Sequence, residues 1–152
     1  MATSNFSDVA ATTFTGALVG NVTGNVTGNV TGQVNYTTVA RTATAAGLTT
    51  GTIADAGMLQ FVTVTSANAA HIIILPTPTP GTIVILANGA TGYELRSSAP
   101  ATVAINGGAE AEAESAIAAS TMVVAVCTSA TTWQAIGLAG TTLAAVEAAA
   151  AA

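Results

Sequence analysis

The feature that most constrains this chain is a four-residue repeat that runs from Gly16 to Val34 as GALVGNVTGNVTGNVTGQV. Because four is an even number, an extended strand would place each glycine of the repeat on the same side as the aliphatic residue two positions later. Asparagine and threonine dominate the other side. A strand of this kind cannot bury its apolar side alone, so the repeat predicts association with other copies of the chain.

The length of the repeat favours a bundle of such strands. Extended at ~3.3 Å per residue, residues 16–34 would span about 60 Å, which is longer than the usual strand of a globular domain. A three-fold bundle would cover the Val/Gly side and leave the Asn/Thr side in water. We therefore expect this segment to be the stem of an intertwined homotrimer, with these trimer-interface residues: Leu18, Val22, Val26, Val30 and Val34.

Two other interpretations of the repeat are weaker. Glycine at every fourth position also matches the close-packing face of helices in lipid. The Asn-Val-Thr triplets between the glycines are poor helix formers, however, and each glycine costs a helix about 1 kcal/mol relative to alanine. The triplets also match the N-glycosylation sequon. No signal-peptide pattern is evident at the start of the sequence, so we interpret that match as a by-product of the repeat.

Charged residues are scarce, at 6% of the chain, and Arg41 and Arg96 are its only cations. The net charge of −5 argues against nucleic acid as a partner, because binding phosphates needs clustered lysine and arginine. It argues equally against an anionic membrane surface. The apolar runs are far shorter than the ~20 residues of a spanning helix, so we expect no membrane partner. Low charge also predicts that each subunit is buried in an oligomer or a larger particle.

From Met58 onward, short runs of β-forming residues alternate with turn signals. The Asn-Gly pairs at 88–89 and 106–107 are the strongest of these signals. Strands at this spacing predict a β-sandwich or a small β-barrel. The expected strands are 58–65, 71–75, 82–87, 93–96, 101–105, 121–127 and 132–136.

The chain as a whole is expected to be all-β, with an extended repeat stem followed by the sandwich or barrel. Its alanine-rich end contains the best helix-forming stretch, residues 143–152, although this is shorter than the about 12–15 residues at which an isolated helix is marginal. A short packed helix and a frayed end are the two alternatives for it. We divide the chain into an N-terminal arm (1–15), the stem (16–34), a Thr/Ala/Gly-rich linker (35–57), the β domain (58–138) and an alanine-rich tail (139–152).

Few residues offer catalytic or metal-binding chemistry. His71 has no second histidine or cysteine at ligand spacing, which favours a structural role. Cys127 is the only cysteine and lies in an apolar run, so we interpret it as a small buried hydrophobe. Glu110, Glu112 and Glu114 would share one side of an extended strand and could attract Ca²⁺. The surrounding loop lacks the Asp/Asn/Gly pattern of a calcium site, which favours a solvated acidic loop.

Glu94 and Arg96 lie two positions apart on an expected strand, which predicts a cross-strand or intersubunit ion pair. A glycosidase-like pair of carboxylates is disfavoured because acidic residues are few, and no nucleophile-elbow or phosphate-loop motif is present. We therefore expect no enzyme activity, no cofactor and no metal. Tyr93 and Trp133 are expected in the core, and an exposed sugar-stacking role is the alternative.

Both the repeat and the β domain resemble proteins of bacteriophages. Tandem GNVTG segments look like those of phage tail-fibre and head-decoration proteins. The runs LPTPTPGTIVILANG at 75–89, ATVAINGG at 101–108 and 121–133 with its ending VCTSATTW resemble a domain common in tailed-phage virion proteins. Together the resemblance covers most of residues 16–138.

The resemblance implies a trimeric structural protein on the capsid surface of a phage virion, made in the host cytoplasm. The first choice is a capsid decoration protein of the cement or head-fibre type. Its partners would be copies of itself and the major capsid protein, which the arm around Phe6 and Phe14 would contact. The alternative is a tail-fibre or adhesin component that binds a host-surface glycan, with Tyr93, Trp133 and Arg96 as candidates. No catalytic residues come with the resemblance.

Overall fold

The computed structural model describes residues 36, 38–139 and 142–150, for 142–145 the backbone alone. The chain divides into two compact units, Met1–Gln33 and Val34–Ala152, and every described residue belongs to the second. The predicted arm and stem lie outside the described residues.

The described residues form ten strands and one short 3-10 helix, η1 (Thr49–Gly51), with no α-helix among them. The all-β prediction is therefore confirmed. The strands are β1 (Thr38–Thr42), β2 (Leu59–Thr65), β3 (Ile72–Ile74), β4 (Ile83–Asn88), β5 (Tyr93–Arg96), β6 (Ala104–Ile105), β7 (Glu114–Ile117), β8 (Thr121–Ser129), β9 (Thr132–Ala139) and β10 (Thr142–Ala145).

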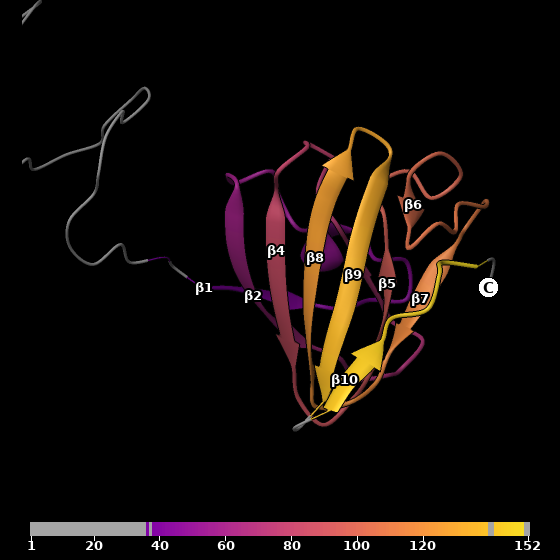
Figure 1. The fold of residues 1–152 in the computed structure, drawn as a ribbon. Helices are drawn as coiled ribbons and strands as arrows, with labels where there is room; N and C mark the ends of the chain where they lie inside the picture. The colour runs from indigo at the N-terminus through magenta and orange to yellow at the C-terminus, as the bar shows by residue number, and fades with distance from the viewer. Residues whose placement is uncertain (1–35, 37, 140–141, 151–152) are drawn as a thin grey trace, which may run out of the picture. The chain divides into compact units, whose positions relative to one another are not determined.

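The strands form two sheets (Figure 1). The larger sheet has seven strands in the order β1-β2-β4-β8-β9-β10, with β6 also paired to β9. Its centre is antiparallel, β4 to β8 to β9, while β1, β2 and β4 run parallel to one another. The smaller sheet has the order β3-β5-β7.

One hydrophobic core lies between the two sheets. The larger sheet contributes Leu86, Val123 and Trp133, and the smaller sheet contributes Tyr93 and Leu95, each at most 1% exposed. Residues of both sheets belong to the same cluster, so the sheets pack face to face in the manner of a sandwich. Inward-facing residues alternate along each strand with outward-facing ones, as the pleat requires.

Residues 38–57, expected to be part of a linker with short extended pieces, contain a strand of the larger sheet and residues of the core. Strand β1 pairs in parallel with β2 over five residues. Beyond it, Ala43 and Ile53 are each 2% exposed and belong to the core. A parallel pair needs a long connection, so its two strands are far apart in the sequence and no local pattern links them.

The described part of the alanine-rich tail is a strand followed by residues without regular secondary structure and a β-bridge at Ala150, so this stretch is not a short packed helix, one of the two expectations for it. Strand β10 pairs with β9, and Val146 and Ala149 are buried. The backbone of Ala150 exchanges two hydrogen bonds with that of Glu114, at 2.8 and 3.1 Å. A helix of this length has little stability of its own, and strand edges on both sheets satisfy the backbone groups instead.

The Asn106-Gly107 turn reverses the chain and also bonds to strand β9 and to the tail. Asn106 has a positive φ of 51°, and its side chain bonds the free edge of β9 between β6 and β10. Its Oδ1 accepts from the N–H of Ala135 at 2.8 Å, and its Nδ2 donates to the carbonyls of Ala135 at 2.9 Å and Val146 at 2.7 Å. At the next residue but one, Gly108, an added Cβ would overlap the backbone of Ala149. This turn therefore ties the tail to the larger sheet.

Asn88, the first residue of the other Asn-Gly pair, has a similar role where β4 ends and β8 begins. Its Oδ1 accepts from the N–H of Thr121 at 2.9 Å. Its Nδ2 donates to the carbonyls of Thr91 at 2.9 Å and Ala118 at 3.0 Å. Both side chains thus satisfy backbone groups at places where the strand ladder is interrupted.

Candidate functional site

The outer face of the larger sheet is the most distinctive surface among the described residues. On β4 and β8, the residues that alternate with the buried ones are aliphatic rather than polar. The same holds at the start of β2 and at the end of β9. We call this surface the apolar face. Its members are Leu59, Phe61, Ile83, Ile85, Met122, Val124, Val126, Ile136 and Leu138.

The strand register makes the apolar face continuous. Phe61 is paired with Ile85, Ile85 with Val124 and Val124 with Ile136, so one apolar row crosses four strands. A second row on one side contains Leu59, Ile83 and Val126. A third row on the other side contains Met122 and Leu138. In Figure 1 no other described strand lies across β4 and β8.

Side chains on this face shield one another but remain open to solvent. Met122 is 39% exposed and Ile136 is 47% exposed, whereas Ile85 and Val124, in the middle of the face, are half-buried. A groove of about 580 Å³ adjoins the face, bounded by β8, β9 and Val146. Its lining is mostly aliphatic, so it offers shape and apolar contact rather than reactive groups.

The sequence contains a signal for this face. The runs Ile-Val-Ile-Leu in β4 and Met-Val-Val-Ala-Val in β8 are continuously apolar. Strands covered on both sides have this pattern, whereas strands with one side in water alternate apolar and polar residues. Composition alone could not show which side of each strand faces the core.

The outer face of the smaller sheet has the opposite character, because charged residues gather on it. Arg96 Nη1 donates to Glu112 Oε2 at 2.6 Å, and Arg96 Nη2 donates to Glu114 Oε1. The side chains of Arg96 and Glu114 are 15% and 10% exposed, but that of Glu112 is 71% exposed. Arg96 is directly paired with Glu114 across the strands, which confirms the predicted cross-strand ion pair. Its partners are Glu112 and Glu114, not Glu94.

Glu94 also lies on this charged face. Within the described residues, neither ion pair involves its carboxylate. Partial burial and, to a lesser degree, the negative charge of Glu114 raise the pKa of the Glu94 carboxyl above its ordinary value. A carboxyl with a raised pKa in the folded state contributes stability below its unfolded pKa. That contribution is lost as the pH rises through the folded pKa.

Glu94→Gln should therefore raise the melting temperature at pH 7, because it removes a charge that the folded state disfavours. The difference from the wild type should shrink as the pH falls through the raised folded-state pKa of Glu94, and should be gone below the ordinary pKa of a glutamate. Thermal unfolding at a fixed protein concentration, followed between pH 4 and pH 7, measures both effects. Glu110→Gln changes the net charge equally at an exposed loop position and serves as the control. Equal melting temperatures of wild type and Glu94→Gln at pH 7 would contradict the prediction.

The residues singled out for chemistry have structural roles. His71 is half-buried, and its Nδ1 lies 3.2 Å from the carbonyl of Ala43. Cys127 is 1% exposed, its Sγ donates to the carbonyl of Ser129 at 3.1 Å, and burial raises the pKa of its thiol. A buried thiol with a raised pKa is a poor nucleophile. The interpretation of Cys127 as a buried hydrophobe is confirmed.

Tyr93 and Trp133 are core residues, at 1% and 0% exposure. Burial raises the pKa of the Tyr93 phenol well above its ordinary value. With Arg96 engaged by two carboxylates, none of the three residues proposed to contact a glycan offers a free surface for stacking on a sugar. The core interpretation of both aromatics is confirmed.

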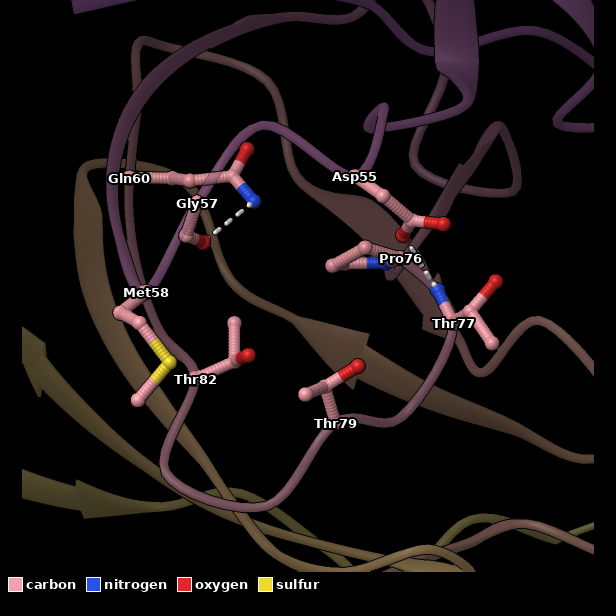
Figure 2. Close-up of a pocket in the computed structure, with 8 residues that line it drawn as sticks. All are labelled: Asp55, Gly57, Met58, Gln60, Pro76, Thr77, Thr79 and Thr82. Atoms are coloured by element: carbon pink, nitrogen blue, oxygen red, sulfur yellow. Dashed lines mark hydrogen bonds between the residues drawn. The ribbon is translucent and has the colours of Figure 1, made fainter. Parts of the chain in front are cut away.

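A small pocket of about 220 Å³ lies beside the proline-rich loop before β4 (Figure 2). The Asp55 carboxylate accepts a hydrogen bond from the backbone N–H of Thr77 at 2.9 Å, and the two lie together at one side of the pocket. Gln60 Nε2 donates to the carbonyl of Gly57 at 3.5 Å. Asp55 is the one ionisable side chain among the eight residues that line the pocket, so an acid–base pair is missing there.

Within the described residues, no three histidine, cysteine, aspartate or glutamate side chains are grouped so that they could hold a metal ion. Glu110 and Glu112 are exposed, as expected for an acidic loop, whereas Glu114 begins β7.

No helix in the described part of the chain is long and apolar enough to cross a membrane.

The residues predicted to form the trimer interface and to contact the capsid lie outside the described residues. They are Leu18, Val22, Val26, Val30 and Val34 for the trimer, and Phe6 and Phe14 for the capsid. The predictions for these residues stay predictions. The described residues add the apolar face, a surface that the sequence analysis missed.

Comparison with known proteins identifies no relative. No protein-family model matches the chain, no curated protein matches it, and no solved structure matches its fold.

Proposed function

We propose that this chain is a structural subunit on the exterior of a tailed-phage particle, a capsid decoration protein of the cement or head-fibre type that acts as a homotrimer. The observation that carries the proposal is the apolar face, an uncharged surface of a kind that marks association rather than catalysis. The phage-like repeat and turn motifs of the sequence support the choice of particle.

In the proposed mechanism each segment of the chain has a separate role. The stem, residues 16–34, joins three copies, and the arm with Phe6 and Phe14 contacts the major capsid protein. A trimer that binds the assembled shell but not free capsid subunits stabilises the shell by mass action. The β domain then adds bulk at the surface without a reaction of its own.

Removing residues 1–15 should abolish binding to capsids and leave the oligomer intact. Co-sedimentation with purified capsids measures the first property, and light scattering after size exclusion measures the second. The double variant Phe6→Ala/Phe14→Ala should show the same loss in a full-length chain, whereas Thr12→Ala/Thr13→Ala, in the same arm, should bind normally. Binding by the truncated protein that equals binding by the full chain would contradict the arm's proposed role.

The copy number per particle separates decoration from the tail-fibre alternative. A decoration protein covers the capsid lattice and is present in many copies, whereas a tail carries few trimers. Quantitative mass spectrometry of purified particles against the major capsid protein gives the ratio. A ratio that fits only a few trimers would contradict the decoration proposal.

A further inference from the structure

We infer that the apolar face of the β domain is buried against other copies of this chain, as a subunit interface separate from the stem. Its place in a phage particle rests on the proposed function, but the interface itself does not. Three features of the described residues support it: the pattern of the central strands, the absence of ionisable groups, and the area of the face.

The central strands of the larger sheet are built to be covered on both sides. In β4, Val84 and Leu86 face the core and are 0% exposed, while Ile83 and Ile85 point outward between them. Strand β8 repeats this arrangement, with aliphatic residues on both sides. Leaving the outer side in water forgoes about 25 cal/mol per Å² of apolar surface. The core of the described domain covers one side only. On the other side Tyr36 packs against Phe61 at one edge of the face, with ring centroids 5.8 Å apart, while Met122 and Ile136 remain open to a partner.

The chemistry of the face selects a copy of itself as that partner. Along the described strands β1, β2, β4, β8 and β9, every outward-facing side chain is uncharged. Burying an unpaired charge against such a surface costs several kcal/mol, so the partner surface must also lack charge. The smaller sheet, with Arg96 and its carboxylate partners, does not qualify. The apolar face of a second copy qualifies as the partner surface. When two such faces meet, no charge is buried and no like charges are brought together.

The size of the face fits a protein–protein interface. Four strands about 4.8 Å apart and three rows about 6.8 Å apart give a flat area on the order of 400 Å². Thr63 and Gln134 lie within these rows. Exposed threonines beyond them, including Thr38, Thr42 and Thr128, continue the uncharged surface outward as a polar rim. These rows supply about half of the about 800 Å² that each partner contributes to a standard interface, and the rim extends the surface further. The apolar centre and polar rim match the usual anatomy of an interface.

Cysteine substitutions in the full-length chain test whether another copy covers the face. Ile136→Cys places a thiol on the apolar face, and Ala116→Cys places one on an exposed strand position of the smaller sheet. For each variant, the rate of reaction with a maleimide in buffer is divided by its rate in denaturant. This ratio should be at least about tenfold lower for Ile136→Cys than for Ala116→Cys. A short bismaleimide should link Ile136→Cys between chains but leave Ala116→Cys unlinked. The native Cys127 is buried and should stay unmodified.

A charge on the face tests whether the interface holds copies together without the stem. A stem variant with Val22, Val26 and Val30 changed to aspartate should remain oligomeric through the apolar face. Adding Ile136→Glu should weaken that association at least about 100-fold and give monomers, because it buries an unpaired charge. Adding Ala116→Glu should not. Circular dichroism and Trp133 emission check that every variant is folded.

Two outcomes of the cysteine experiments, one in labelling rate and one in cross-linking, would overturn the inference. Equal relative rates for the two cysteine variants would show that the face is open to solvent. A protected Ile136→Cys that forms no link between chains would show that a segment of the same chain or another protein covers it. A folded but monomeric stem variant would equally overturn it. Loss of capsid binding or a low copy number would instead count against the proposed function and leave the interface standing.

Discussion

Trp133→Ala should lower the free energy of unfolding by about 3–5 kcal/mol, the usual cost of removing a large buried aromatic side chain. Trp133 is 0% exposed and lies on the core side of β9, directly paired with Cys127 of β8. Its removal leaves a cavity between the two sheets, where neighbouring strands restrict collapse. Since a domain of this size has only about 5–15 kcal/mol of stability, the variant should unfold at a much lower urea concentration.

Urea unfolding followed by circular dichroism measures this loss, at a fixed subunit concentration because association stabilises the folded state. Gln134→Ala is the matched control on the same strand, since that side chain points outward and should change stability by less than about 0.5 kcal/mol. Trp133→Phe should cost less than Trp133→Ala, because it leaves a smaller cavity and removes a buried indole N–H that has no hydrogen-bond partner among the described residues. Equal stability of Trp133→Ala and Gln134→Ala would contradict the placement of this residue.

Asn106→Ala should cost about 2–4 kcal/mol, from the loss of three side-chain hydrogen bonds and from backbone strain. Without the amide, the N–H of Ala135 and the carbonyls of Ala135 and Val146 lose their partner. The φ of 51° is tolerated by asparagine but disfavoured by alanine. Because Asn106 joins β9 to the tail, the amide hydrogens of Ala135 and Ala149 should exchange faster in the variant.

Asn106→Gly separates the two contributions. It relieves the strain at positive φ but removes the same hydrogen bonds, so it should fall between the wild type and Asn106→Ala. Thr131→Ala, at an exposed position of the turn before β9, is the control and should leave stability and exchange at Ala135 unchanged. A loss below about 0.5 kcal/mol for Asn106→Ala would show that solvent replaces these bonds.

The strand positions could be predicted wherever the local pattern was strong. Runs of β-branched residues bounded by proline, glycine or Asn-Gly pairs marked β2, β4, β8 and β9, because strand propensity and turn chemistry act over a few neighbouring residues. The position of Arg96 on a strand predicts that it forms an ion pair with a residue of a neighbouring strand. Its partners could not be named, since the register of β5 against β7 depends on a pairing across the acidic loop.

Three strands were missed, β1, β7 and β10, and two of them, β1 and β10, share a physical cause. Strand β1 has a mixed Thr/Val/Ala/Arg sequence, and β10 lies in an alanine-rich stretch whose local preference is helical. Each becomes a strand because a neighbouring edge of the larger sheet accepts its backbone hydrogen bonds. Local propensity is worth tenths of a kcal/mol per residue, so the pairing and burial available in the folded domain override it.

The sequence by itself determined the all-β class, most strand positions, the two Asn-Gly turns and the burial of Cys127, Tyr93 and Trp133, because these follow from local pattern and side-chain polarity. Only the tertiary structure decided which side of each strand faces the core. That choice depends on how the two sheets stack, which involves contacts far apart in the sequence. Stacking placed the charged residues on the outside of the smaller sheet and left a continuous apolar face on the outside of the larger one.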